Sequence, residues 1–301
     1  MKNLNDITVV IVTYKTDEKI IFDCLKSINS QVKILIVENS KNFTHDKKIL
    51  SSFPNTKVFC SGENLGYGKG NNYGLKLVET KYALILNPDV ICEKDFFNNI
   101  VDVINQTKDF TIIGCQYLND KIFMPAGFFD KEKNNRFKDD FMNNKVDNLS
   151  KVEWVTGCSM LINLEKFINK EIFDKNFFLY FEEIDLCKSV LKKGENIFTS
   201  QKLKIHHLGF KSSTDESTND NTNLNKVREW HWMWSSFYFY KKHYGINKAI
   251  YTFSGKLIKS FLKNLYFSIT FQQNKKNKYL YRFLGLLNSF LNKPSFFRGK
   301  F

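Results

Sequence analysis

The 301-residue chain has no pair of cysteines separated by two residues, and its six cysteines are scattered between positions 24 and 187. This absence excludes a disulfide framework and a cysteine zinc site. Scattered single cysteines are typical of buried thiols in a protein of a reducing compartment. The first residues lack the long apolar core and the small-residue cleavage site of a signal peptide. We therefore expect a cytoplasmic protein.

Acidic residues are absent from the last part of the chain. Residues 241–301 hold 13 Lys and Arg and no Asp or Glu, whereas the rest holds 32 basic and 31 acidic residues. The body is thus close to neutral and the tail is cationic, which points to an anionic partner, either a membrane surface or nucleic acid. The length suggests one catalytic-sized domain with a smaller appendage. We predict domains over 1–223 and 224–301, the second a basic amphipathic helical region.

Four short apolar runs in the first ninety residues predict strands buried on both faces. They span residues 7–14, 33–39, 57–61 and 82–87, and helical patterns lie between them. Strands that alternate with helices predict a parallel α/β sheet, in which ligands bind at the carboxyl ends of the strands. Three of the runs end in polar residues of the kind that bind ligands, namely Thr13-Tyr14-Lys15, Glu38-Asn39-Ser40 and Asn87-Pro88-Asp89.

Two stretches near these strand ends could bind a nucleotide and a metal. The segment ENLGYGKGNNYG (63–74) has four glycines and three asparagines, which let the backbone approach a ligand closely. An ordinary turn-rich loop is the alternative. In LILNPDV (84–90), Asp89 follows an apolar strand and could hold Mg²⁺ or Mn²⁺. A strand-terminating Asn-Pro-Asp turn explains that stretch equally well.

Two further stretches concentrate titratable side chains. In FFLYFEEIDLC (177–187), three carboxylates follow a run of large apolar residues. Clustered carboxylates repel one another unless a cation or a proton is near. A helix N-terminus stabilised by the macrodipole would explain the acids but not the aromatic run. His206 and His207 end a short strand, and a histidine with a distant aspartate could complete a hard-metal site; a partly buried histidine pair is the alternative.

Taken in order over residues 7–213, these motifs resemble glycosyltransferase family 2, in particular its bacterial rhamnosyltransferase-like branch. The matching segments read VTYK, IVENS, NLGYGKGNNYG, LILNPDV, VEWVTGCSMLI, FFLYFEEIDLC and HHLG. The resemblance implies a GT-A fold, which is α/β and Rossmann-like, with a mixed, mostly parallel sheet flanked by helices; a C-terminal helical extension follows here. It also implies an inverting, metal-dependent hexosyltransferase that uses Mg²⁺ or Mn²⁺.

The resemblance further implies the substrates. The donor would be a nucleoside-diphosphate sugar, dTDP-rhamnose or a UDP-sugar. The acceptor would be a glycan or a lipid-linked saccharide in bacterial surface polysaccharide synthesis, such as O-antigen (lipopolysaccharide) or capsule.

Site residues are implied by the same resemblance. Glu183 would be the general base, Asp185 would help to place the acceptor, and Asp89 with His206 would bind the metal. The base is Glu where Asp is usual, which keeps the chemistry and moves the carboxylate away from the backbone. The nucleotide cleft would comprise Thr13, Tyr14, Glu38, Asn39, Asn64, Gly66, Asn71 and Asn87. The acceptor or sugar pocket would comprise Trp154, Gly157, Tyr180 and Glu182, with Phe177, Phe178 and Phe181 excluding water.

The cationic tail contains a basic amphipathic helical pattern over residues 253–265. No lysine-free apolar stretch there approaches the ~20 residues of a transmembrane helix. On a helical wheel, Phe253, Leu257, Ile258, Phe261, Leu262 and Leu265 share one half, opposite Lys256, Lys259 and Lys263. Such a helix suits an anionic bilayer surface, although packing on the catalytic domain is the alternative. We expect peripheral association with the inner face of the cell membrane, and exposed aromatic residues would permit a homodimer.

Two other functions compete with the glycosyltransferase interpretation. A nucleotidyltransferase would need a Gly-rich, basic phosphate loop after the first strand, where this chain has TYKTDEK. A nucleic-acid- or membrane-binding protein that acts through the tail would leave Asp89, Glu183 and His206 without a role. A processive synthase would carry a Q-x-x-R-W motif and transmembrane helices. We therefore favour the glycosyltransferase and expect no nucleic-acid partner.

Overall fold

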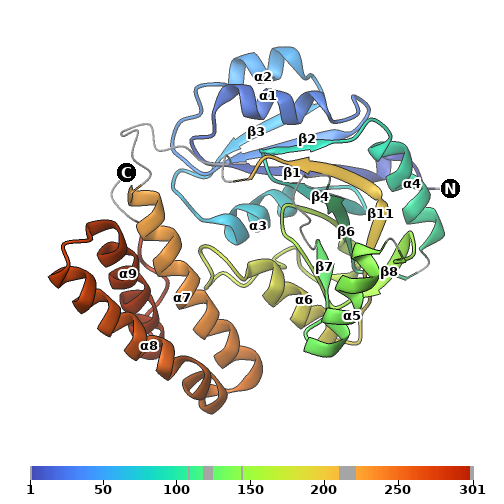
Figure 1. Cartoon of the computed structure of the whole chain (residues 1–301). Coiled ribbons are helices and arrows are strands. Elements are labelled where there is room, and N and C mark those ends of the chain that lie inside the picture. The colour runs from blue at the N-terminus through green and yellow to red at the C-terminus, as the bar shows by residue number, and fades with distance from the viewer. Residues whose placement is uncertain (1, 108, 118–124, 144, 210–221, 299–301) are drawn as a thin grey trace. The chain divides into compact units, whose positions relative to one another are not determined.

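The chain divides into two compact units. One contains Met1–Phe173 and Glu183–Thr214, and the other contains Asp174–Glu182 and Asp215–Phe301. The predicted domains 1–223 and 224–301 differ from these units in two respects. The second unit begins at Asp215, and Asp174–Glu182 belongs with the C-terminal helices. The structure is a computed structural model that describes residues 2–107, 109–117, 125–143, 145–209 and 222–298 (Figure 1).

The N-terminal unit is built on a mixed sheet with the strand order β3-β2-β1-β4-β10-β6-β11-β5, and β8 pairs with β11. A second, short sheet pairs β7 (Ala126–Gly127) with β9 (Trp154–Val155). The four strands predicted in the first ninety residues are confirmed. The main-sheet strands are β1 (Ile7–Thr13), β2 (Lys33–Glu38), β3 (Thr56–Cys60), β4 (Tyr82–Leu86), β5 (Val90–Cys92), β6 (Ile112–Tyr117), β8 (Leu149–Val152), β10 (Ser159–Asn163) and β11 (Ile197–His207).

The sheet changes from parallel to antiparallel at β4. Strand β1 pairs in parallel with β2 and β4, and β2 pairs in parallel with β3. Strand β10 is antiparallel to both β4 and β6, and its first residue, Ser159, lies opposite Leu86. The loop before β10 therefore meets the turn after β4, where the Asn87 N–H donates to the Cys158 carbonyl at 2.8 Å. The predicted mixed α/β class is confirmed.

Helices cover both faces of the sheet, because neighbouring strand residues point in opposite directions. Val9 and Ile11 of β1 share a core with α1 (Glu18–Lys26), α2 (Asp46–Ser52) and α4 (Phe96–Gln106). Val10 shares the other core with α3 (Tyr67–Leu77), α5 (Lys131–Met142) and α6 (Glu182–Lys192). Figure 1 shows α1 and α2 across the sheet from α3.

Helix α3 lies very close to the sheet because its inner face is made of glycine. A Cβ added at Gly70 would lie 2.8 Å from Val12 Cγ1, and one at Gly74 would lie 2.6 Å from Val10 Cγ1. Gly66, just before the helix, has a φ of 80°, which glycine adopts without strain. Gly70 and Gly74 therefore serve helix–sheet packing, in place of the predicted close approach of the backbone to a ligand.

The C-terminal unit is a bundle of α7 (Thr222–Tyr244), α8 (Ile246–Ile269) and α9 (Gln273–Phe290). Gly245, with a φ of 86°, allows the turn between α7 and α8. Arg282 of α9 bonds to Glu229 of α7. None of the helices in the described ranges has the length and apolarity that a membrane crossing needs. The small core contains Met233, Phe237, Ala249, Phe253 and Leu286.

The segment Asp174–Glu182 packs on α7. The ring of Phe177 lies 5.0 Å from that of Tyr238, and the ring of Phe178 lies 4.8 Å from that of His231. Phe177 is fully buried and Phe178 nearly so. The prediction that these two phenylalanines wall a sugar pocket is therefore wrong, because α7 occupies their surroundings.

The end of this segment has an unusual backbone. Tyr180 and Phe181 have φ values of 69° and 71°, a region that bulky residues rarely adopt. Such strain costs roughly 1–3 kcal/mol per residue. Both rings contact Trp232, at 5.4 and 5.5 Å between centroids, and Phe181 also contacts Phe239 at 5.4 Å. This aromatic packing offsets the strain in the chain that leads into α6.

Residues that follow α9 contact both α7 and the segment Asp174–Glu182. Burial lowers the pKa of His231 to about 3, so the neutral ring donates from Nε2 to the Phe297 carbonyl at 2.6 Å. The guanidinium of Arg298 lies 3.6 Å from the centroid of the Phe178 ring. The C-terminal residues thus help to fix the segment Asp174–Glu182 on α7.

Two helix glycines give a matched test of this bundle. A Cβ at Gly285 of α9 would lie 2.1 Å from the Trp230 carbonyl oxygen, whereas Gly255 of α8 has no atom within 4 Å of that position. We expect Gly285→Ala to lower the free energy of unfolding by about 3 kcal/mol through overpacking. Gly255→Ala should raise it by about 1 kcal/mol through helix propensity. Urea unfolding followed by tryptophan fluorescence measures both, and equal effects would contradict the packing.

Candidate active site

The predicted nucleotide-cleft residues meet at the carboxyl ends of β1 and β2. The Thr13 hydroxyl donates to Glu38 Oε2 at 2.6 Å, and both residues are buried. The Lys15 N–H approaches the other carboxylate oxygen of Glu38 at 3.4 Å. The Asn39 amide donates to the Gly66 carbonyl at 3.0 Å. Glu38 is therefore a buried acceptor at the centre of a polar edge.

The turn into α3 completes this edge. Asn64 Oδ1 accepts from the Gly66 N–H at 3.0 Å, and Asn71 Nδ2 donates to the Tyr67 carbonyl at 3.0 Å. The Oδ1 atoms of Asn39 and Asn71 are buried and have no hydrogen-bond partner within the described ranges. Buried acceptors are usually paired, so these two oxygens mark a place where a ligand with donor groups would fit.

Tyr14 and Asn87 are the remaining members predicted for the cleft. The Tyr14 N–H donates to the Thr16 hydroxyl at 3.3 Å, directly after β1. Asn87 directly follows β4, the parallel neighbour of β1. The structure therefore brings all of the predicted cleft residues to one edge of the sheet.

Asp89 lies in the turn after β4, and its carboxylate is completely buried. His207 Nε2 is 3.3 Å from Asp89 Oδ1, whereas His206 pairs with Glu93. Neighbouring residues on a strand point to opposite faces, so only one of the two histidines can reach Asp89. The structure therefore places His207, and not the predicted His206, beside Asp89.

Asp89 and His207 supply a carboxylate and an imidazole, both of which bind divalent cations. Within the described part of the chain, no three His, Cys, Asp or Glu side chains are grouped closely enough to hold a metal alone. A buried carboxylate is costly unless a positive group is near. The pair therefore fits a cation whose other ligands come from a bound molecule and water.

Glu183 lies in the first turn of α6 and packs against Gly157. A Cβ at Gly157 would lie 3.3 Å from Glu183 Cβ and 3.2 Å from the Tyr67 hydroxyl oxygen. That hydroxyl donates to the Gly157 carbonyl. Burial raises the pKa of Glu183 above its ordinary value. The absence of a side chain at residue 157 thus leaves the space in which the Glu183 side chain sits.

Tyr117, at the end of β6, connects the Asp89 side of the site with the Glu183 side. Its ring lies 5.9 Å from the His207 ring, between centroids. Its hydroxyl donates to Thr156 Oγ1 and accepts from the Cys158 thiol at 2.6 Å. Burial above all raises the pKa of Tyr117 well above its ordinary value, and the negative charge of Glu183 adds to this rise.

Three residues of this arrangement are not among the predicted site residues. Tyr67 lies inside the NLGYG motif, which could have drawn attention to it. Tyr117 ends a strand, as the predicted cleft residues do. Glu93 gave no signal, because its partner His206 is 113 positions further along the chain.

The other predicted residues have these surroundings. Trp154 Nε1 donates to the Phe128 carbonyl at 3.1 Å. Asp185 is buried on α6. Tyr180 and Glu182 belong to the C-terminal unit, where the Tyr180 ring packs on Trp232. Their roles with the acceptor stay predictions.

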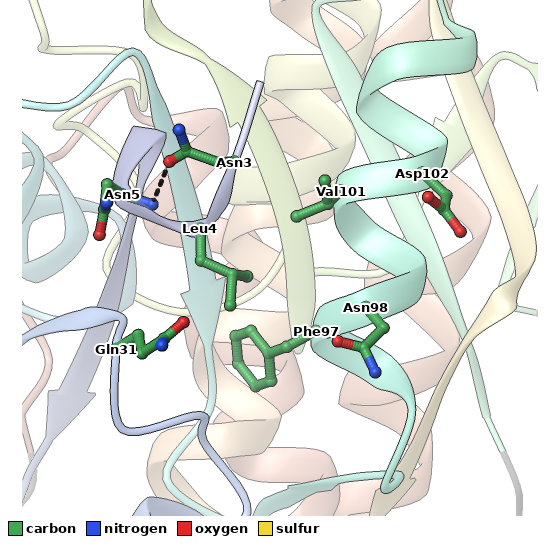
Figure 2. Close-up of a pocket in the computed structure, with 8 residues that line it drawn as sticks. All are labelled: Asn3, Leu4, Asn5, Gln31, Phe97, Asn98, Val101 and Asp102. Atoms are coloured by element: carbon green, nitrogen blue, oxygen red, sulfur yellow. Dashed lines mark hydrogen bonds between the residues drawn. The ribbon is translucent and has the colours of Figure 1, made fainter. Parts of the chain in front are cut away.

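A pocket of about 370 Å³ lies at the other edge of the sheet (Figure 2). Its residues precede β1 and β2 or lie on α4, so it is at the amino ends of these strands. None of the predicted site residues lines it. The lining residues are Asn3, Leu4, Asn5, Gln31, Phe97, Asn98, Val101 and Asp102.

Solved structures with the same fold are GT-A glycosyltransferases. GalNAc-T7 with UDP, GalNAc and Mn²⁺ aligns with a TM-score of 0.53 and 11% identity, over 86% of this chain and 58% of that chain. Mannosyltransferase PcManGT of Pyrobaculum calidifontis, with GDP-Man and Mn²⁺, aligns with a TM-score of 0.53 and 11% identity, over 96% of this chain and 88% of that chain. The chain thus spans less than two thirds of the first structure. At this identity the likeness establishes the fold, and the predicted GT-A class is confirmed.

The sequence relatives define the family. The profile of Glycosyl transferase family 2 matches residues 8–170, and the chain belongs to this family. The low-salt glycan biosynthesis hexosyltransferase Agl10 of Haloferax volcanii is 26% identical over 212 residues, 68% of this chain and 67% of the relative. Rhamnosyltransferase WbbL of Escherichia coli is 22% identical over 222 residues, which are 65% of this chain and 78% of the relative. The protein is a glycosyltransferase, and its relatives include enzymes of glycan biosynthesis.

The raised pKa of Glu183 predicts a pH-dependent cost in stability. Because its pKa is higher in the folded than in the unfolded chain, its contribution to stability is present below about pH 4.5 and is lost as the pH rises through the folded pKa. Glutamine resembles the neutral acid. We expect Glu183→Gln to match the wild type at about pH 4 and to be more stable at higher pH, by about 1.4 kcal/mol for each unit of pKa elevation.

Urea unfolding at a series of pH values measures this difference. The control is Glu79→Gln, at an exposed position, which should show no such trend. A Glu183→Gln variant that is equally destabilised at every pH would contradict the assigned burial.

Proposed function

We propose that this family 2 enzyme is an inverting, metal-dependent hexosyltransferase. Its donor would be dTDP-rhamnose or a UDP-sugar, and its acceptor a glycan or lipid-linked saccharide in bacterial O-antigen or capsule synthesis. The observation that carries the proposal is the connection of Asp89 and His207 with Glu183 through Tyr117, beside the polar edge at β1 and β2. The rhamnosyltransferase name of one relative favours the donor.

The nucleotide part of the donor would lie along the polar edge. The orphaned Oδ1 atoms of Asn39 and Asn71 would accept hydrogen bonds from base or ribose donors. Glu38, held by Thr13, would accept from a further hydroxyl or N–H group. Tyr14, Asn64, Gly66 and Asn87 would shape the cleft.

Asp89 and His207 would hold Mg²⁺ or Mn²⁺. When bound, such an ion would neutralise charge on the departing diphosphate. The two solved neighbours contain Mn²⁺, which supports a divalent cation here. His207 takes this role in the proposal because His206 is paired with Glu93.

Glu183 would act as the general base. It would take the proton from an acceptor hydroxyl while that oxygen bonds to the anomeric carbon and the bond from this carbon to the diphosphate oxygen breaks. Attack from the face opposite the leaving group inverts the anomeric configuration. A raised pKa makes the carboxylate a stronger base near neutral pH. Tyr67 and Tyr117 would keep the loop before β10, which contacts Glu183 through Gly157, in position. Asp185 would help to place the acceptor.

We also propose that the protein works at the inner face of the cell membrane, where lipid-linked acceptors would be available. Residues 230–301 contain no Asp or Glu, which favours association with anionic lipids. The protein would bind the membrane peripherally through its C-terminal region.

Nucleotide binding gives the first test. We expect dTDP, UDP or GDP to raise the melting temperature only together with Mn²⁺ or Mg²⁺, because a ligand that binds the folded state stabilises it. At a ligand concentration 100 times the Kd, the gain would be about 2.7 kcal/mol. Asp89→Asn should abolish the shift. Differential scanning fluorimetry measures it.

The matched control is Asp102→Asn, at an exposed position on α4 in the distant pocket. This variant should keep the full shift. If folded wild-type protein showed no shift with any of the nucleotides, the proposed donor site would be wrong, and a binding protein without catalysis would be favoured.

Transfer itself tests the base. Glu183→Gln should lower the release of nucleoside diphosphate from the donor by at least about 100-fold, since a general base contributes about 10²–10⁴-fold. The assay would supply dTDP-rhamnose, UDP-glucose and GDP-mannose together with extracted bacterial lipid-linked saccharides. In the wild type, kcat should rise with pH through the elevated pKa of Glu183. Near-normal transfer by the variant, with its nucleotide-dependent melting shift intact, would remove Glu183 from the proposed role.

A further inference from the structure

Helix α8 has two apolar faces, and only one of them is covered. Ala249, Phe253 and Ser260 are buried, and Leu257 packs against the core of the helical bundle. The helical wheel predicted a single apolar half in which Phe253 and Leu257 accompany Ile258, Leu262 and Leu265. The structure separates these residues, because the first two face α7 and α9 and the others face outward.

The uncovered face is a continuous apolar stripe. Its members are separated by seven, four, three and four positions, which places them along one side of a helix. The stripe extends over nineteen residues, from Tyr251 to Ile269, so its ends are about 27 Å apart at 1.5 Å per residue. Its side chains and their exposed fractions are Tyr251 (82%), Ile258 (59%), Leu262 (57%), Leu265 (45%) and Ile269 (76%).

The turn after α8 extends this stripe. Phe271 is 93% exposed, and its φ of 54° lies in the left-handed region that glycine favours. An exposed phenylalanine in a strained conformation costs stability without an internal contact that would offset it. Together with Ile269, Phe271 adds a large apolar surface at the turn between α8 and α9.

The charge beside the stripe has one sign. Lys248 and Lys259 are exposed and lie on one flank of the stripe, since each residue turns the helix by about 100°. Lys256 lies further round the helix, with its ammonium group 4.3 Å from the centroid of the Phe253 ring. None of these three lysines takes part in an ion pair within the part of the chain that the structure describes. The sequence has no acidic residue after Glu229. The face therefore combines apolar side chains with uncompensated positive charge.

We propose that this exposed face of α8, with Phe271 at its end, docks the protein flat on an anionic lipid surface. The inference rests on the membrane association proposed above and adds the face that makes it. A helix with an apolar stripe and a basic flank lies in the plane of a bilayer surface, apolar side down. A second copy fits less well in an antiparallel two-fold contact, because that contact brings the like-charged lysine flanks of the two helices together.

The test uses the full chain and vesicles, without donor or acceptor. Wild type should co-sediment with vesicles of phosphatidylglycerol and phosphatidylcholine, and more weakly with phosphatidylcholine alone or at high salt. The stripe variant Ile258→Gln/Leu262→Gln/Ile269→Gln should partition at least tenfold less. Its matched control, Leu50→Gln/Met142→Gln/Ile168→Gln, removes exposed apolar side chains of the N-terminal unit and should bind as wild type does.

A second pair of variants tests the charge. Lys248→Gln/Lys259→Gln should weaken binding to the anionic vesicles and reduce its salt dependence. The control Lys33→Gln/Lys57→Gln removes two exposed lysines elsewhere and should leave vesicle binding and its salt dependence unchanged.

Three outcomes would overturn the inference. Wild type could fail to bind the anionic vesicles, or the stripe variant could bind as well as its control. The stripe variant could also convert a wild-type dimer into a monomer in gel filtration with no change in vesicle binding, which would make the face a protein interface. The nucleotide-dependent melting shift, measured on the same variants, reports separately on the glycosyltransferase site.

Discussion

The antiparallel pairing of β10 with β4 is the constraint on which the candidate site depends. In a wholly parallel sheet, the segment before β10 would enter at the amino edge, far from Asp89. The reversal brings that segment to the carboxyl end of β4, where Asn87 bonds to the Cys158 carbonyl. Glu183 packs on the same loop through Gly157. A single change of strand direction therefore brings Glu183, the proposed base, to the end of the sheet that holds Asp89, the proposed metal ligand.

Much of the N-terminal unit could be predicted from the sequence, because its strands are short buried runs and its polar motifs follow them directly. Thr13, Glu38 and Asp89 were identifiable for this reason, since a parallel strand that ends in a polar residue places it at a known edge. The glycines of α3 form a recognisable motif in the sequence, but their role in packing the helix on the sheet cannot be read from it. Only the packed structure shows that Gly70 and Gly74 give the helix its close contact with β1.

The features that the sequence did not reveal depend on contacts between distant residues. His206 and His207 are adjacent and chemically identical, and the register of β11 against β5 decides which one meets Asp89. Phe177 and Phe178 are covered by a helix more than fifty positions later. A helical wheel likewise cannot distinguish one broad apolar face from two, and on α8 the neighbouring helices cover Phe253 but leave Ile258 exposed.

The path of the chain between the two units limits how the protein can be divided. The chain leaves the N-terminal unit at Phe173, packs nine residues on α7, and returns at Glu183. Cutting the chain before α7 would therefore not release a self-contained N-terminal fragment, because Phe177 and Phe178 would lose the surface that buries them. The C-terminal helices therefore do not form a module that can be separated at one point of the chain, because their unit includes Asp174–Glu182. An exchange of this region between related enzymes would have to include the segment ahead of Glu183 as well, so the two parts of the sequence are constrained to change together.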